Sequence, residues 1–153
     1  MANTYTQIHI HVVCVVQNRK SLIKAIWKEE LYRYVGGIIK NKGHKVLAIN
    51  GVEDHIHILF GLRPFQSLSD LMREVKCSSS FWINERKFLP SRFSWQKGYA
   101  AFSYSKDQIS RVINYISNQE AHHRKKSFGE EYKALLNEFE IDYDEKYIFN
   151  SIT

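Results

Sequence analysis

The chain has little of what marks secreted, membrane-spanning or repetitive proteins. Among its 153 residues are two cysteines, Cys14 and Cys77, which have neither the spacing of a metal site nor the number of a disulfide framework. No apolar run approaches the roughly 20 residues of a membrane span. The first residues lack the basic and then apolar pattern of a signal peptide. We therefore expect a cytoplasmic protein with reduced thiols.

Breaks along the chain are equally few. We find no repeat, no low-complexity segment and no linker, and the two prolines, Pro64 and Pro90, fall in expected loops. What is abundant is apolar and aromatic: 44% of the residues are hydrophobic, with nine Phe, nine Tyr and three Trp. This composition and length are typical of one folded domain with its own hydrophobic core.

The net charge of +6 conceals an uneven distribution. Residues 127–153 hold seven acidic and two basic side chains, whereas residues 1–126 hold twenty basic and nine acidic ones. A body this basic favours polyanionic partners, because phosphate contacts release condensed counterions. A basic surface that serves only solubility is the alternative.

The spacing of apolar residues predicts four strands and four helices. Alternation with a period of two predicts strands, and spacing of three to four residues predicts amphipathic helices. The strands are expected at 7–16, 45–52, 55–61 and 99–104, and the helices at 22–42, 68–86, 106–123 and from Ser127 onward. Gly36 and Gly37 lie inside the first helix, where each costs about 1 kcal/mol. We take them as a sign of close backbone packing.

The order of these elements predicts the fold. The pattern β-α-β-β-α-β followed by two helices is typical of an α+β, ferredoxin-like fold (split βαβ, RRM-like) with an antiparallel sheet. We expect helices on one face of the sheet, with two further C-terminal helices. In the first and third strands the isoleucines must then point at the helices. The histidines of those strands would point to the open face.

Two His-x-His pairs interrupt these strands, His9 with His11 and His55 with His57. Alternate residues of a strand share one face and lie roughly 6.5–7 Å apart, so two imidazoles can converge on one metal ion. A histidine on a half-exposed face can also be only a tolerated polar residue. A third ligand has to come from elsewhere in the chain.

The helix expected at 106–123 supplies a candidate. At about 100° per residue, Tyr115 lies roughly 120° from the apolar stripe of this helix. It shares its side with Gln108, Arg111, Gln119 and His122. A tyrosine grouped with polar side chains is not expected to be a residue of the hydrophobic core. An amphipathic surface tyrosine is the alternative.

Six segments carry a resemblance to a known family: YTQIHIHVV, NRKSLI, GHKVLAINGVEDHIHILFGL, SLSDLMREVKCSSSFWIN, FSWQKGYAAFSYS and VINYISNQEAHHRK. Together they resemble the IS200/IS605-type single-tyrosine (Y1) transposases, which belong to the HUH (His–hydrophobic–His) endonucleases. The resemblance runs over residues 5–149 as a single domain. Its strongest part is His55-Ile56-His57 followed by Tyr115-x-x-x-Gln119.

The resemblance implies a role for each of these residues. His55, His57 and Gln119 would be metal ligands, with Mg²⁺ or Mn²⁺ as the cofactor, and Tyr115 would be the nucleophile. The implied reaction cleaves single-stranded DNA beside a hairpin and keeps the energy of the diester in a 5′-phosphotyrosine. The implied assembly is a homodimer with composite active sites, in a bacterial cytoplasm at the nucleoid.

Basic and aromatic side chains are candidates for DNA contacts. Cations can follow the phosphate backbone, and loop aromatics can stack on bases. The candidates are Arg73, Lys76, Arg92, Trp95, Lys97, Arg111 and Arg124, with Phe93, Lys125 and Lys126 as further members. Loop aromatics can instead anchor their loop.

Three alternatives stay open. Paired His-x-His strands are similar to the His-x-Ser/Thr motifs of 2H phosphoesterases, although His11 and His57 stand where that pattern has Ser or Thr. A binding module like an RRM would lack chemistry, but its aromatic residues are missing from the central strands. A domesticated, repeat-associated relative of the transposases could retain all the catalytic residues. His9, His11 and His122 have no role fixed by sequence.

Overall fold

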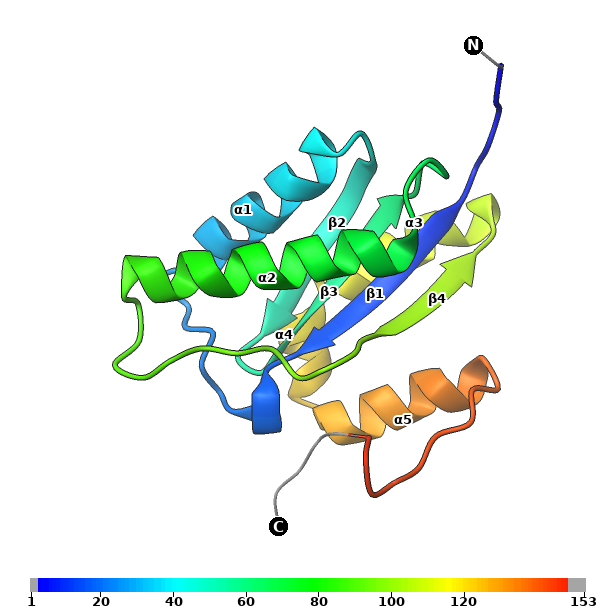
Figure 1. Ribbon diagram of the computed structural model, residues 1–153. Coiled ribbons are helices and arrows are strands. Elements are labelled where there is room, and N and C mark those ends of the chain that lie inside the picture. Colours follow the sequence, from blue (N-terminus) through cyan, green and yellow to red (C-terminus); the bar gives the residue numbers. More distant parts are fainter. Residues whose placement is uncertain (1–2, 149–153) are drawn as a thin grey trace.

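The computed structural model describes residues 3–148 and shows one four-stranded sheet between two layers of helices (Figure 1). Residue 149, the end of the expected domain, lies outside the described residues. The elements are β1 (His9–Val15), the 3₁₀ turn η1 (Gln17–Arg19), α1 (Lys28–Asn41), β2 (Lys45–Val52), β3 (His55–Gly61), α2 (Leu68–Arg86), β4 (Ala100–Tyr104), the 3₁₀ turn η2 (Lys106–Gln108), α3 (Ile109–Ser117), α4 (Gln119–His123) and α5 (Phe128–Glu138).

The sheet is antiparallel, with the strand order β2-β3-β1-β4. Strands β1 and β3 are therefore the central pair, as the sequence predicts. Their register places Val13 opposite His57 and Val15 opposite His55. The expected α+β fold is confirmed.

The main hydrophobic core lies between the sheet and helices α1 and α2. Strand β3 contributes Ile56, Ile58 and Phe60, all fully buried, because alternate residues point to the same face. Helix α2 begins as predicted: Ser67 precedes it, and its hydroxyl accepts a hydrogen bond from the backbone nitrogen of Asp70 at 3.1 Å.

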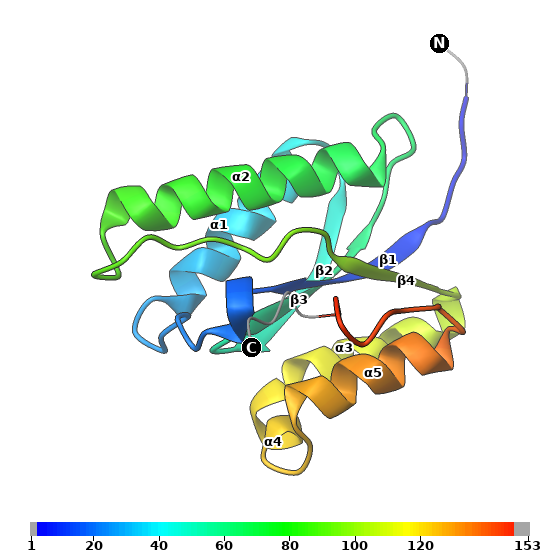
Figure 2. The same ribbon diagram turned by 60° about the horizontal axis from the view of Figure 1, so that its bottom comes forward.

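The second face of the sheet is not open, and this corrects the expectation from sequence. Helices α3, α4 and α5 cover it, on the side opposite α1 and α2 (Figure 2). As a result His11, His55 and His57 are all completely buried. The apolar side of α5, with Phe128 and Tyr132, packs against the sheet in a second core. The second face of the sheet therefore also carries apolar side chains that a helix layer must bury.

Two helix boundaries also differ from those expected. Helix α1 begins at Lys28, because the residues before it form only turns. The helix expected at 106–123 is broken at Asn118, whose φ of −104° and ψ of 27° leave the helical region. The amide nitrogen of Asn50 on β2 donates to the carbonyls of Ile116 and Ser117 at 3.0 and 3.2 Å. This side chain satisfies carbonyls that the break leaves without partners.

The hairpin of β2 and β3 depends on a glycine. A Cβ on Gly51 would lie 2.2 Å from the carbonyl oxygen of His55 and 2.8 Å from Cα of Ile56. Only a residue without a side chain allows the two strands to approach this closely. Gly51 therefore fixes the position at which β3 begins, and with it the backbone of His55.

Within residues 3–148, no helix has the length and apolar character required to cross a membrane. Both cysteines are free thiols, Cys14 in the core and Cys77 at the surface.

We predict that Gly51→Ala destabilises the fold by about 1–3 kcal/mol, because the added methyl group meets backbone that has no room to move. Urea unfolding measures the change. Gly37→Ala is the matched control, since a Cβ there meets no atom of residues 3–148 within 4 Å and an alanine favours the helix. Equal stability of the two variants would contradict this account of the hairpin.

Candidate active site

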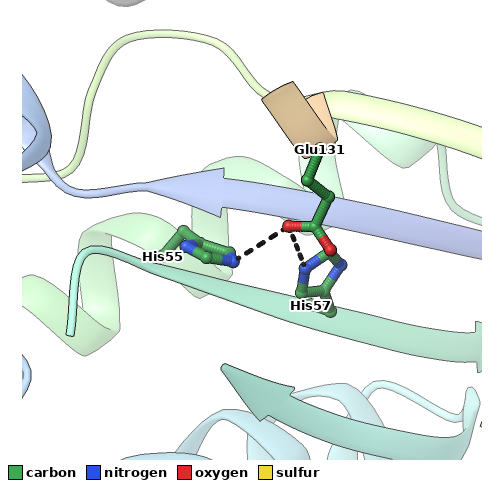
Figure 3. Close-up of side chains that lie close together, drawn as sticks. All are labelled: His55, His57 and Glu131. Carbon is green, nitrogen blue, oxygen red and sulfur yellow. Dashed lines mark ion pairs between the residues drawn. The ribbon is translucent and has the colours of Figure 1, made fainter. Parts of the chain in front are cut away.

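Three buried side chains converge on the covered face of the sheet. The ligand atoms of His55, His57 and Glu131 all lie within 4.8 Å of one another. The histidines come from β3 and the glutamate from α5, as Figure 3 shows. Oε1 of Glu131 lies 3.5 Å from Nε2 of each imidazole. Two imidazoles and a carboxylate arranged in this way can hold a metal ion.

A carboxylate orients His55. Its Nδ1 lies 2.8 Å from Oδ1 of Asp54, and because a carboxylate can only accept, Nδ1 donates. Nε2 is thereby directed toward Glu131. This carboxylate–histidine arrangement is the one that commonly fixes the ring of a metal ligand. Although burial lowers the pKa of His55, its interactions with Asp54 and Glu131 raise it more, so the pKa lies above the ordinary value of a histidine.

A second histidine orients His57. Nδ1 of His57 and Nε2 of His11 are 2.7 Å apart, in a buried hydrogen bond. When Nδ1 of His57 donates, its Nε2 keeps a lone pair for an ion. Burial, more than any other cause, lowers the pKa of His57 to about 4, so the imidazole is neutral at pH 7. His11 thus supports His57.

The donor atoms of this cluster fit a divalent ion. Nε2 of His57 is fully buried and has no hydrogen-bond partner among the described residues, because 3.5 Å to Glu131 is too long for a directed bond. A buried polar atom without a partner is costly, and an ion would satisfy it. Imidazole and carboxylate suit several divalent metals, so the donors leave the identity of the ion open.

Glu131 is the centre of the cluster. Only 2% of its side chain is exposed, and burial alone would raise its pKa. Its interactions with His55, His57 and Tyr115 lower that pKa below its ordinary value instead. Glu131 is therefore a carboxylate at neutral pH, which is the form that binds metal ions.

Tyr115 lies beside the same cluster. Its hydroxyl donates to Oε2 of Glu131, and its ring centroid lies 5.7 Å from that of His57. A pocket of about 170 Å³ leads to this tyrosine, and its lining includes Arg111 and Lys126. Burial and then the charge of Glu131 raise the pKa of Tyr115, so the phenol is protonated at neutral pH.

Gln119 lies within reach of the histidines as well. It is completely buried, and its Oε1 lies 3.3 Å from Nε2 of His55. Its Nε2 donates to Oε2 of Glu131 at 3.2 Å. The break at Asn118 separates Gln119 from the helix of Tyr115, and both side chains still face Glu131. Its role as a metal ligand stays a prediction.

Sequence reasoning missed Glu131 and His123. Nε2 of His123 lies 3.0 Å from Oε1 of Glu131 and 3.1 Å from Oε1 of Gln119. A signal for Glu131 was present: it follows Phe128 by three residues and precedes Leu135 by four, on the edge of the apolar side of its helix. A carboxylate at the edge of a buried stripe requires a partner.

Three of the expected DNA-contacting residues gather on the α2 side, away from the histidines. Arg73, Lys76 and Lys97 line a pocket of about 320 Å³ there. Arg73 pairs with Asp70 at 3.1 Å. Lys76 donates to two backbone carbonyls at 2.7 and 2.6 Å, which ties it to the loop before β4.

The loop aromatics are core residues, which favours the alternative that they anchor their loop. Phe93 is 1% and Trp95 is 8% exposed, and Nε1 of Trp95 donates to Oγ of Ser79 at 2.9 Å. Both rings anchor the loop, and a contact of Trp95 with DNA stays a prediction. Arg111 lines the pocket at Tyr115, whereas Arg92 and Arg124 are exposed elsewhere.

His122 and His9 differ in position. Nε2 of His122 lies 3.6 Å from Oε2 of Glu131, and its ring contacts that of Tyr115 edge to face. His9 belongs to β1 opposite Gly61 and Tyr104. Its Nδ1 is buried and has no hydrogen-bond partner among residues 3–148, and His9 is not part of the group formed by His55, His57 and Glu131.

The fold and this site define a class: an α+β protein in which a buried His-His-Glu group that can hold a metal lies beside a tyrosine. The chain belongs to the family described as "Transposase IS200 like", whose model matches residues 4–119.

Known relatives agree with this assignment. The ISDra2 transposase TnpA of Deinococcus radiodurans is 20% identical over 118 residues, which cover 74% of this chain and 84% of that protein. Two solved structures share the fold. One, from Deinococcus radiodurans R1 and described as a transposase, has a TM-score of 0.61 at 18% identity and covers 78% of this chain and 95% of its own. The other, a REP-associated tyrosine transposase bound to a REP hairpin, has a TM-score of 0.60 at 15% identity and covers 80% and 73%.

We predict that Mn²⁺ stabilises the protein through this cluster. At a concentration about 100 times its dissociation constant, a bound ion adds about 2.7 kcal/mol to the free energy of unfolding. His57→Ala removes one ligand and should abolish the gain, whereas His9→Ala, which removes a histidine of β1, should keep it. Thermal unfolding with Mn²⁺ and with EDTA measures the difference. An undiminished gain in His57→Ala would place the ion elsewhere.

Proposed function

We propose that this protein is a metal-dependent DNA transposase that cleaves and rejoins single strands through Tyr115. Membership of the IS200-like transposase family supports a nuclease activity on DNA. The single observation that carries the proposed mechanism is the sharing of one carboxylate. Oε2 of Glu131 accepts a hydrogen bond from the hydroxyl of Tyr115, and Oε1 faces the imidazoles of His55 and His57.

Tyr115 acts as the nucleophile in this proposal. A phenol with a raised pKa attacks only when its proton has an acceptor, and Oε2 of Glu131 stands at that place. The phenolate oxygen forms a bond to phosphorus as the bond to the 3′-oxygen breaks. The products are a 5′-phosphotyrosine and a free 3′-hydroxyl. Rejoining reverses these steps without ATP, because the covalent link keeps the energy of the diester.

The residues around Tyr115 prepare it for a phosphate. His55, His57 and Glu131, with the amide oxygen of Gln119, would hold the divalent ion. When bound, such an ion supplies a Lewis acid that polarises the phosphate and stabilises the leaving oxygen. Arg111 and Lys126 line the pocket at the tyrosine, where they would attract the backbone of the strand.

A DNA hairpin is the proposed recognition element. One structural neighbour, a REP-associated tyrosine transposase, is bound to a REP hairpin. The strongly basic body formed by residues 1–126 is suited to such a polyanion. In this proposal the hairpin is bound as a folded unit and the adjoining single strand enters the pocket at Tyr115.

The composite active site implied by the family resemblance, in which the tyrosine helix of one subunit would meet the histidine pair of the other, is not required to assemble this site. In a single chain α3 packs on the sheet through Val112 and Ile116, and this packing brings Tyr115 to its own His57. A homodimer stays a prediction. If it forms, each subunit already holds a tyrosine beside its histidine pair.

We predict that Tyr115→Phe abolishes covalent attachment to DNA and leaves binding intact, because it removes only the attacking oxygen. The measurement uses single-stranded oligonucleotides with a hairpin, Mn²⁺ and a denaturing gel. Tyr104→Phe is the matched control, since Tyr104 lines the same pocket and makes no hydrogen bond to Glu131 among the described residues. Hydrolysis that continues in EDTA and leaves no adduct would favour the phosphoesterase alternative. Binding without cleavage would favour a binding module.

We predict a separate effect of Glu131→Gln. The amide keeps an oxygen that can ligate an ion but cannot take up the proton of Tyr115. Adduct formation should therefore fall by roughly 10²–10⁴, the usual contribution of a positioned proton acceptor. Stabilisation by Mn²⁺ should persist in part. Single-turnover rates and thermal unfolding of the same variant separate the two roles, and a wild-type rate would exclude Glu131 as the acceptor.

A further inference from the structure

We propose that the pocket beside Tyr115 receives one unpaired nucleobase of the DNA strand, and that Glu138 selects a base with an exocyclic amino group. This inference rests on the proposed function and deepens it, because it assigns a base preference to the same site. The pocket has a volume of about 170 Å³ and lies between helices α3 and α5, both of which line it. Figure 2 shows these helices side by side, running in opposite directions.

The walls of the pocket are apolar and aromatic. Val112 of α3 and Leu135 of α5 are buried side chains that line it. The ring of Tyr104 on β4 also lines it, and contacts the rings of His11 and Phe139 at centroid distances of 6.1 and 5.4 Å. Enzymes hold an unpaired base in this way, by packing its faces against aromatic and apolar side chains. The ring of Tyr104 provides this wall, so Tyr104→Phe keeps it.

Two opposite charges line the pocket without pairing with each other. Arg111 of α3 and Glu138 of α5 are both exposed, and neither forms an ion pair within residues 3–148. Both act on the hydroxyl of Tyr104: burial and then the charge of Glu138 raise its pKa to about 12, whereas Arg111 opposes this rise. A guanidinium donor and a carboxylate acceptor are therefore available to one ligand.

The position of Glu138 is not explained by the stability of its helix. Glu138 is the last residue of α5, where the helix dipole is negative and a carboxylate is unfavourable. Its charge also faces a pocket that takes up a phosphodiester in the proposed function, and like charges repel. A carboxylate in this position favours binding when it accepts hydrogen bonds from the ligand.

The amino group of a base matches this acceptor. Cytosine, adenine and guanine each carry an amino group that donates hydrogen bonds, and an acidic side chain is a recognised partner of N4 of cytosine. Thymine has no amino group, and its single ring N–H lies between two carbonyl oxygens that repel a carboxylate. Arg111 can donate to an acceptor on the edge of the same base. The pocket should therefore prefer a base with an amino group to thymine.

A base next to the scissile phosphate can reach Glu138. Glu131, which accepts a hydrogen bond from Tyr115, and Glu138 are seven residues apart and line the same pocket. At 1.5 Å per residue they lie roughly 10 Å apart along the helix. A phosphate at the oxygen of Tyr115 therefore leaves room for its own sugar and base in the rest of the pocket.

The test measures binding of short single strands that cannot form a hairpin, with the variant Tyr115→Phe so that no adduct forms. The probes are homopolymers of deoxycytidine, 5-methyldeoxycytidine and thymidine, each about 8 nucleotides long. The base 5-methylcytosine has the ring and the methyl group of thymine, so the last two probes differ only at the edge that Glu138 would read. Fluorescence anisotropy should show both cytosine strands binding about tenfold more tightly than the thymidine strand. Equal affinity for the last two probes would overturn the proposal.

Glu138→Gln, added to Tyr115→Phe, should remove this preference. An amide both donates and accepts, so it can bind thymine as well, and the affinities for 5-methylcytidine and thymidine strands should differ by less than about twofold. Glu85→Gln is the matched control, because Glu85 is an exposed carboxylate on α2, on the other face of the sheet. This control should keep the full preference. A preference that persists in Glu138→Gln, or that is lost equally in Glu85→Gln, would contradict the role of Glu138.

Ala134→Leu, in the same Tyr115→Phe protein, fills the pocket without changing a charge. Ala134 is an exposed residue of α5 that lines the pocket, and leucine is also a good helix former. This variant should bind the cytidine strands no more tightly than the thymidine strand. A thermal midpoint equal to that of the parent protein shows that the fold is intact. The full preference in a folded Ala134→Leu protein would exclude this pocket as the place where the base binds.

Adduct formation is measured separately, in the protein that retains Tyr115. An adduct formed by a protein without any base preference would contradict the base pocket and leave the proposed function in place. A base preference in a protein that forms no adduct would support the base pocket and contradict the proposed function. The two failures are therefore distinguishable.

Discussion

One buried carboxylate, that of Glu131, constrains the whole second face of the sheet. Its oxygens accept hydrogen bonds from Tyr115 and Gln119 and face the imidazoles of His55 and His57. A carboxylate with 2% exposure is tolerated only when such partners surround it, because losing them costs several kcal/mol. Helix α5 therefore cannot move off the sheet without leaving a charge unpaired. The same constraint keeps the tyrosine beside the candidate metal ligands.

Local pattern was sufficient to predict most of the fold. The hairpin of β2 and β3 and helix α2 lie at the expected residues, because alternation and the Ser67 cap are encoded within a few positions. The covered histidine face was not predictable in this way, since it depends on how α5 docks from far along the sequence. The break at Asn118 likewise depends on Asn50 of a distant strand.

The residues of the candidate site that lie close together along the sequence were predictable, and those that lie far apart were not. His55 and His57 share a strand face, and Tyr115 and Gln119 are one helical turn apart, so spacing alone groups each pair. Glu131 and His123 belong to neither pair and join them only through packing. The loop aromatics Phe93 and Trp95 are a different case, because the sequence allowed either a contact with bases or an anchoring role, and the folded chain buries both rings.

The central claim is that an ion and the tyrosine meet at Glu131, and a diffraction experiment tests it most directly. Crystals soaked in Mn²⁺ and measured at its absorption edge should give an anomalous peak about 2.2 Å from Nε2 of both His55 and His57, with Tyr115 in the adjoining pocket. A peak elsewhere, or the absence of any peak between the two imidazoles at saturating Mn²⁺, would contradict the account.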